Sequence, residues 1–511
     1  MLILLSNSQK FIKNTLILTA ASLSLNVISM AFRIFISAQI GTEGLGLFTL
    51  IMSVYFFAST VASSGINLSV TRLVSESAGS KQNPAEILYK SIFLAVALGS
   101  FSAILLFICS DFIAVHWLCD RRAALPLKIL AFSLPFFGIS VCFGGYFMAK
   151  RRVWCIAKWQ IFDQLLQIFA TVVFLSVMPK GNIPSRCCAI VSGSVFGEIA
   201  ACAYGFILYD RCGEKYVPSG GKKLYKSILS ISLPIAISSY FRAGLSTLEN
   251  ILIPKGFSKL QVSKEAALSE YGILKGMAMP AISFPSALLG SLSSLLIPEI
   301  SEAASVKDKK KVARLSLIAV QGCIIYSILI LAVFFTFGNP LGIALFDNPR
   351  SGHIMKIISW AIPFIYMDSV FDGILKATNQ QVASMKYNTL EGISRIVLLY
   401  ALIPVYGTVG FIVVVFVSNM LSSFLGLIKV LQVTGVKINI ADCILMPLLM
   451  AVCCAFFAKA AALPFAGNVI LYSVIGVTVL AASFSALIFL CRKKSAHSQK
   501  TSQHTDTVRT N

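Results

Sequence analysis

The hydrophobic residues of this chain gather in about fourteen blocks of roughly 20 residues, the length that a helix needs to cross a lipid bilayer. Of its 511 residues, 57% are hydrophobic and only 13% are charged, whereas about a quarter of an ordinary globular domain is charged. We therefore predict an all-α polytopic membrane protein. The expected spans cover residues 11–37, 45–71, 89–109, 124–148, 155–178, 187–209, 226–253, 270–297, 313–337, 354–377, 384–404, 408–432, 441–461 and 468–491.

Positive charge falls mainly in every second loop between these blocks. Of the 43 Lys and Arg, we assign 28 to the N-terminus, the even-numbered loops and the C-terminal tail, ten to the odd-numbered loops and five to the spans, and most cations near the end of a span are counted with the adjoining loop. Because cytoplasmic loops of membrane proteins carry the excess of Lys and Arg, both termini are expected in the cytoplasm of a bacterial cell. The net charge of +22 then reflects topology and contact with anionic phospholipids, and no nucleic-acid partner is expected.

The two halves of the chain resemble each other at an offset of 226 to 228 residues. The run 134–149 aligns with 362–377 without a gap, and Gly46 falls on Gly272. Chance matching among apolar residues is the alternative explanation. Since six spans per half is an even number, both halves enter the membrane from the same side and form a parallel repeat.

This repeat predicts the domain organisation. Two similar lobes that face each other across a pseudo-twofold axis along the membrane normal enclose a central cavity, and rocking of the lobes gives alternating access to it. The expected parts are an N-lobe at 1–216 with helices 1–6, a C-lobe at 217–437 with helices 7–12, a helix pair at 438–494 and a disordered cytoplasmic tail at 495–511.

Positive residues in or beside the apolar spans are the candidate substrate ligands, because a charge at the bilayer centre costs at least ~2.5 kcal/mol. Arg33 lies in the first span and Arg242 in the seventh, so the first helix of each lobe carries an arginine. A planar guanidinium suits bidentate binding of phosphate. Alternatively, Arg242 pairs with Glu249, or each arginine reaches to a membrane interface. The candidate substrate-binding residues are Arg33, Arg242, Lys275, Arg72 and Asn26.

Acidic residues inside the spans are candidates for ion coupling or for lining the cavity. They are Asp368, Asp372, Glu249, Asp163 and Glu198. Asp368 and Asp372 stand four residues apart, so their side chains share one face of a helix. Two carboxyl groups held that close favour a site that responds to H+ or binds Na+. Alternatively, one of them pairs with Arg395 or Lys376.

The eighth span is the best candidate for a bending helix. It contains Pro280 and Pro285 together with Gly272, Gly276 and Gly290. Such breaks are tolerated in a membrane where neighbouring groups or water satisfy the freed carbonyls. We therefore expect an irregular helix here and a part for it in gating.

Enzyme motifs are absent from the sequence: there is no Walker loop, nucleophile elbow, HExxH motif or dinucleotide fingerprint. The 13 cysteines are scattered without the spacing of metal ligands. We expect no enzymatic activity, no cofactor and no metal. Without an ATP site, transport must draw on an ion gradient, the membrane potential or downstream consumption of the substrate.

Several stretches resemble the multidrug/oligosaccharidyl-lipid/polysaccharide (MOP) exporter superfamily, most closely its stage V sporulation protein B-like branch of oligosaccharide flippases. The segments that carry the resemblance are 32–76, 271–303, 362–380 and 402–411. The resemblance implies fourteen helices, with two six-helix lobes plus a C-terminal pair, and it maps the family's first-helix arginine onto Arg33. The chain departs from the usual Gly-Ile-Pro at Asn67, and it is more acidic than relatives around Asp368 and Asp372.

We therefore predict a monomeric flippase that moves a polyprenyl-pyrophosphate-linked saccharide, such as a lipid II-like cell-wall or polysaccharide precursor, across the cytoplasmic membrane. One alternative is a cation-coupled, MATE-like multidrug exporter, which requires acids rather than arginines at the cavity centre. The other is a membrane scaffold for envelope or spore assembly that transports nothing. A scaffold tolerates Arg33→Ala, whereas a flippase does not.

Overall fold

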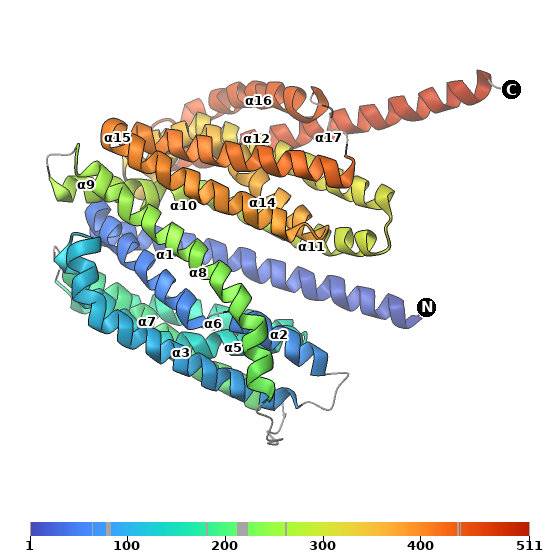
Figure 1. Cartoon of the computed structure of the whole chain (residues 1–511). Helices are drawn as coiled ribbons and strands as arrows, with labels where there is room; N and C mark the ends of the chain where they lie inside the picture. Colours follow the sequence, from blue (N-terminus) through green and yellow to red (C-terminus); the bar gives the residue numbers. More distant parts are fainter. Residues whose placement is uncertain are drawn as a thin grey trace. The chain divides into compact units, whose positions relative to one another are not determined.

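The part of the chain that the computed structural model describes is helical and contains no strand (Figure 1). This result confirms the all-α class, and it has a physical reason. A helix pairs its backbone N–H and C=O groups within one segment, as the interior of a bilayer requires. The structure describes residues 2–63, 65–77, 83–179, 182–211, 223–260, 263–436, 439 and 441–509.

Seventeen α-helices lie within these residues, and short π and 3-10 segments join some of them. The helices are α1 (Leu2–Ser63), α2 (Ile66–Glu76), α3 (Pro84–Phe112), α4 (Ala124–Ala131), α5 (Leu134–Ala149), α6 (Val153–Val177), α7 (Ile183–Asp210), α8 (Lys223–Phe257), α9 (Lys264–Tyr271), α10 (Met279–Ser283), α11 (Ser286–Ser305), α12 (Lys309–Phe346), α13 (Pro349–Ile358), α14 (Ile362–Ala377), α15 (Gln381–Thr434), α16 (Met446–Ala462) and α17 (Val469–Arg509). The joining segments are η2 (Ile113–Trp117), η3 (Arg121–Ala123), η4 (Gly272–Ala278), η5 (Ser359–Ala361), η6 (Ala441–Leu445) and η7 (Leu463–Phe465).

Within the described residues, ten helices are long and apolar enough to span a membrane, or eleven if the bent pair 121–131 and 134–149 forms one span. Two of the ten exceed the length of a single span, because α1 has 62 residues and α15 has 54. Each is broken at a glycine with a positive φ, 68° at Gly41 and 57° at Gly407, which glycine adopts without steric cost. Each therefore covers two expected spans, and the total of fourteen stays a prediction.

The described residues form two compact units that differ in extent from the expected lobes. Unit 1 comprises Met1–Met277 and Gly392–Val414, and unit 2 comprises Ala278–Glu391 and Val415–Asn511. The middle of α15 therefore belongs to unit 1 and its two ends to unit 2. The expected boundaries at 216/217 and 437/438 lie outside the described residues, and the lobe limits stay a prediction.

Unit 1 buries aromatic side chains between its helices and exposes others on its outer surface. Phe143, Tyr146 and Phe147 of α5 are fully buried, and α5 packs beside α3 (Figure 1). In contrast, Ile108 is 71% exposed and Phe169 is 65% exposed. In a membrane protein such apolar side chains face lipid, so their exposure agrees with a set of spanning helices.

The backbone repeats at the offset that the sequence predicts. Helices α5 and α14 both have 16 residues and begin 228 positions apart, each with a proline in its first turn. Residues other than glycine seldom have a positive φ, yet the conformation recurs at the same offset of 228. The two pairs are Cys119 with Asp347 and Arg151 with Asn379. These coincidences of conformation support the repeat over chance matching.

Unit 1 also contains a reciprocal contact between the halves. A Cβ on Gly46 would lie 2.2 Å from the Leu268 carbonyl oxygen, and a Cβ on Gly272 would lie 2.0 Å from the Thr42 carbonyl oxygen. Gly46 and Gly272 are 226 residues apart, as are Thr42 and Leu268. When residue i contacts j while the equivalent of j contacts the equivalent of i, the contact is self-complementary, as at a twofold axis. A pseudo-twofold therefore passes between α1 and α9.

The eighth expected span is irregular, as its prolines and glycines predict. It consists of α9, the π segment η4, α10 and α11, with a turn at Phe284 and Pro285. The irregular helix is confirmed as a feature of the structure, whereas its bending and a part in gating stay predictions.

The end of the chain differs from the expected disordered tail. Helix α17 runs on to Arg509, so the backbone of residues 495–509 is helical. Once a span has nucleated a helix, each further residue adds one hydrogen bond, and the polar residues continue it. Residues 510 and 511 lie outside the described part.

Candidate functional site

One carboxylate in unit 1 lies between two cations from different helices. The Lys275 Nζ is 2.6 Å from Glu249 Oε1, and the Arg395 Nη1 is 3.6 Å from Glu249 Oε2. These side chains are largely buried, with exposed fractions of 19% for Lys275, 23% for Arg395 and 11% for Glu249. The ammonium of Lys275 also lies 5.7 Å from the centre of the Phe411 ring, within range of a cation–π contact. We call Glu249, Lys275 and Arg395 the charged triad.

The local backbone explains where the triad sits. Lys275 lies in the π segment η4, and π segments are common at functional sites. Pro280 has no N–H, so it cannot donate the helical hydrogen bond to the carbonyl of Gly276, four residues earlier. The guanidinium of Arg33 donates to this oxygen instead, with an Nη1–O distance of 3.4 Å.

The Arg33 guanidinium therefore contacts the backbone at Gly276, one residue along the chain from Lys275. Its side chain is partly buried, and no carboxylate among the described residues lies within ion-pair distance of it. A bond to a carbonyl leaves the charge of the guanidinium uncompensated. Arg33 thus contributes a positive charge that no carboxylate of the described residues compensates.

The other predicted substrate ligands lie outside this cluster. Arg242 on α8 is exposed, and it does not pair with Glu249, which is bound to Lys275 and Arg395 instead. Arg72 is 63% exposed and forms an ion pair with Glu76 on its own helix, at 2.8 Å. Asn26 is exposed and donates to the Ser22 carbonyl within α1.

Two of the predicted acids lie on neighbouring helices of unit 1. Asp163 on α6 and Glu198 on α7 are close enough to interact electrostatically, and neither forms an ion pair with a described residue. Helices α6 and α7 pack side by side (Figure 1). The two acids are therefore brought together although they are 35 positions apart in the sequence.

Asp368 and Asp372 lie together on α14 in unit 2, but each has partners of its own. Asp372 forms an ion pair with Lys376 and accepts hydrogen bonds from the side chains of Ser384 and Asn388. Asp368 accepts a hydrogen bond from Ser422. The alternative in which Lys376 neutralises one acid is thus the one observed.

Sequence reasoning missed the part that Arg395 takes in the triad. The only signal was an arginine inside the apolar span 384–404. Its partner Glu249 is 146 positions away, and no local spacing connects the two.

A family model and two proteins of known name match the chain. The family described as "Polysaccharide biosynthesis protein" matches residues 11–304, more than half of the sequence. The chain is 26% identical to Stage V sporulation protein B of Bacillus subtilis (strain 168) over 457 residues, which cover 87% of this chain and 88% of that protein. It is 24% identical to Sporulation protein YkvU of the same organism over 359 residues, which cover 68% and 78% of the two proteins.

Solved structures share the fold. Lipid II flippase MurJ in an inward closed conformation superposes with a TM-score of 0.71 at 15% identity, over 93% of this chain and 99% of that one. An outward-facing multidrug resistance MATE family transporter of the MOP superfamily gives a TM-score of 0.61 at 12% identity, over 83% and 96%. The resemblance to stage V sporulation protein B is confirmed, and the chain shares its fold with transporters of the MOP superfamily. This chain is a multi-pass membrane protein, and it belongs to the polysaccharide biosynthesis protein family.

Proposed function

We propose that this chain is a flippase that moves a polyprenyl-pyrophosphate-linked saccharide, a lipid II-like cell-wall or polysaccharide precursor, across the cytoplasmic membrane. In this proposal the protein acts as a monomer by alternating access, with both termini in the cytoplasm. The observation that carries it is Arg33, a partly buried guanidinium whose charge no carboxylate of the described residues compensates.

The positive charge of this cluster favours binding of an anionic ligand. A charge inside a bilayer costs at least ~2.5 kcal/mol, so charges that persist there are paired or have a function. Lys275 and Arg395 are both paired with Glu249, whereas the only contact of the Arg33 guanidinium with a described residue is the carbonyl oxygen of Gly276. A pyrophosphate group supplies the missing negative charge, and the guanidinium of Arg33 offers it a bidentate grip.

The relatives agree with this substrate class. Stage V sporulation protein B is similar over most of its length, and the structure with the shared fold and a TM-score of 0.71 is that of a lipid II flippase. Those names describe the relatives. For this chain they support a lipid-linked substrate, and the cationic cluster gives the substrate's headgroup a place to bind.

We propose secondary parts for the remaining predicted residues. Arg242, Arg72 and Asn26 are exposed, so they are available to touch substrate before or after it reaches the cluster. We propose Asp163 and Glu198 as the first choice for coupling to H+ or Na+, because neither is neutralised by a described cation. Asp368 and Asp372 are a second choice, since hydroxyl groups and Lys376 already occupy them.

The test is transport by Arg33 variants. We expect Arg33→Ala to slow flipping by about 10- to 100-fold, the effect of losing one charge-assisted hydrogen bond to the transported phosphate. The Arg33→Lys variant retains the charge without the bidentate geometry, so its flipping rate should lie between those of the native protein and Arg33→Ala. Lys459→Ala is the matched control, because Lys459 is an exposed cation on α16.

The measurement is mass spectrometry of polyprenyl-linked intermediates after depletion of the native protein and complementation with each variant. Cells with Arg33→Ala should accumulate the intermediate on the cytoplasmic leaflet, and cells with Lys459→Ala should not. Full complementation by Arg33→Ala would contradict the flippase and support a scaffold.

A second candidate function is a cation-coupled multidrug exporter, favoured by the neighbouring acids Asp163 and Glu198. It predicts that depletion lowers the efflux of cationic dyes while no lipid-linked intermediate accumulates. It also predicts that Glu198→Gln impairs efflux more strongly than Arg33→Ala, which is the reverse of the order expected for the flippase.

A further inference from the structure

A second cationic site lies in unit 1, in two of the odd-numbered loops, which join the expected spans on one side of the membrane. There a cavity of about 260 Å³ opens between the segment that follows η2 and the connection from α8 to α9. Its charged lining residues are Asp120, Arg121, Arg122, Lys255, Lys264 and Glu265. Four cations and two acids line the cavity, and Glu43, which accepts from Arg122, is a third acid, so the excess is one positive charge.

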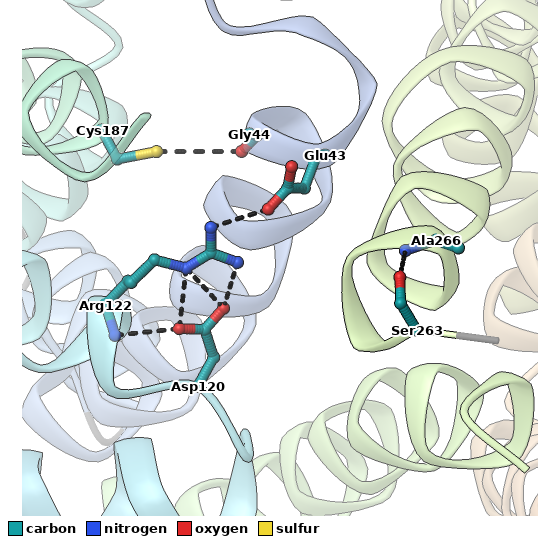
Figure 2. A network of polar contacts seen from close by, with 7 residues as sticks. All are labelled: Glu43, Gly44, Asp120, Arg122, Cys187, Ser263 and Ala266. Atoms are coloured by element: carbon teal, nitrogen blue, oxygen red, sulfur yellow. Dashed lines mark hydrogen bonds and ion pairs between the residues drawn. The ribbon is translucent and has the colours of Figure 1, made fainter. Parts of the chain in front are cut away.

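One of the four cations, Arg122, is already paired with acidic side chains of the protein. Arg122 donates to both oxygens of Asp120 at 2.7 to 3.0 Å and to Glu43 at 2.7 Å, and Figure 2 shows its guanidinium held between the two carboxylates. Arg122 and its acids therefore form a rigid wall.

The other three cations keep their charge available. Arg121, Lys255 and Lys264 form no ion pair with any residue in the described part of the chain. Lys255 donates to the His116 carbonyl oxygen at 3.3 Å, which positions its ammonium without neutralising it. A carbonyl accepts a hydrogen bond but carries no net charge, so an anion is still favoured beside these cations.

Glu265 is the one acid of the lining that has no cationic partner of its own. Hydrogen bonds from its own backbone N–H, the larger cause, and from the Ser263 hydroxyl hold the pKa of the Glu265 carboxyl below its usual value. It is therefore ionised at neutral pH and opposes the binding of an anion. Its removal should strengthen such binding.

The location of these cations argues for a function. Outer loops of membrane proteins are depleted of Lys and Arg, and in the orientation proposed above this side is the outer one. Yet four of the ten cations assigned to the odd-numbered loops line this single cavity. The positive-inside rule explains clusters on the other side, but it does not explain this one.

The rest of the lining indicates a lipid. Leu50, Leu118 and Leu268 also border the cavity, so cations and apolar side chains meet in one place. Trp117, next to Leu118, is 46% exposed, and exposed tryptophan is typical of the membrane interface. A free anion would gain nothing from the apolar part, whereas a headgroup attached to acyl chains would use both parts.

We propose that this cavity binds the phosphate-bearing headgroup of an anionic lipid at the outer membrane interface. Arg121, Lys255 and Lys264 contact the phosphate, the buried leucines form an apolar wall of the cavity, and the exposed Trp117 beside them lies at the level of the acyl chains. The headgroup chemistry is that of a phosphate ester with a net negative charge.

The experiment measures ligand binding to the purified full-length protein in detergent, by native mass spectrometry and by the shift of the thermal unfolding temperature. The ligands are dioctanoyl phosphatidylglycerol, dioctanoyl phosphatidylcholine and inorganic pyrophosphate. We expect phosphatidylglycerol to bind more tightly than either of the others. Tighter binding of pyrophosphate, or equal binding of phosphatidylcholine, would overturn the lipid assignment.

Two matched triple variants locate the site. Arg121→Ala, Lys255→Ala and Lys264→Ala together should weaken phosphatidylglycerol binding by at least about tenfold, since each removes a charge-assisted contact. Lys259→Ala, Arg350→Ala and Lys459→Ala together remove the same charge from residues that do not line the cavity, and should leave binding unchanged. Equal loss in both variants would overturn the proposal.

A variant that should bind more tightly distinguishes loss of the binding site from loss of folding. Glu265→Gln should tighten phosphatidylglycerol binding by about 3-fold, because it removes an opposing charge from an exposed position. Unchanged or weaker binding would count against the site. Arg33→Ala, which is expected to slow flipping, should bind phosphatidylglycerol as the native protein does, so this proposal and the flippase can fail separately.

Discussion

Glu249 shows how a single side chain makes two buried cations tolerable. From α8 it accepts a hydrogen bond from Lys275 and forms an ion pair with Arg395, so neither cation lies uncompensated in an apolar region. The sequence indicated Glu249 and Lys275 separately, as an acid and a cation inside spans. Their pairing depends on the fold, because 26 residues and a change of helix separate them.

We predict that Glu249→Gln destabilises the protein. The substitution keeps the shape of the side chain but leaves two buried cations facing each other, and breaking a buried ion pair costs about 3 to 5 kcal/mol. The measurement is the free energy of unfolding in detergent.

A second substitution separates charge from packing. In the double variant Glu249→Gln with Lys275→Gln the facing charges are reduced to one, so part of the stability should return. A double variant less stable than Glu249→Gln alone would contradict an electrostatic role for Glu249.

At the scale of elements, the contact between α1 and the α9–η4 segment depends on two glycines. Gly46 and Gly272 allow backbones to touch, and the hydroxyls of Thr42 and Ser269 lie 2.6 Å apart beside them. Small residues at such crossings are the usual way for membrane helices to approach closely. The sequence aligned these glycines as repeat partners, but only the fold shows that they touch.

We predict that Gly46→Ala and Gly272→Ala have similar effects. Each new Cβ would overlap a carbonyl oxygen of the opposite helix, which forces the backbones apart and costs about 1 to 3 kcal/mol. Gly290→Ala is the control, because nothing lies within 4 Å of a Cβ there. Thermal unfolding of the three variants is the measurement, and a Gly272→Ala protein as stable as Gly290→Ala would refute the close contact.

At the scale of the whole molecule, charge sets the orientation in the membrane. Cys119 is exposed in the loop between η2 and η3, on the side that the positive-inside rule assigns to the exterior. Lys310 is exposed at the start of α12, on the side assigned to the cytoplasm. The two positions therefore report the orientation proposed for the chain.

We predict opposite accessibilities for a membrane-impermeant maleimide. With Cys119 as the only remaining cysteine, intact cells should be labelled. With Cys119 replaced as well and Lys310→Cys introduced, labelling should require permeabilised cells. The reverse pattern would invert the topology and place the cationic outer cavity in the cytoplasm.

The sequence by itself determined the class, the repeat and the irregular eighth span. These properties follow from short-range physics: runs of apolar residues must be helical in lipid, and proline and glycine disturb a helix where they stand. Only the tertiary structure decided which charges meet. Arg395 pairs with Glu249, Asp163 lies near Glu198, and Arg33 donates to the Gly276 carbonyl, to which Pro280 cannot donate. These contacts join side chains from helices far apart in the chain. Such a separation leaves no periodic pattern in the sequence.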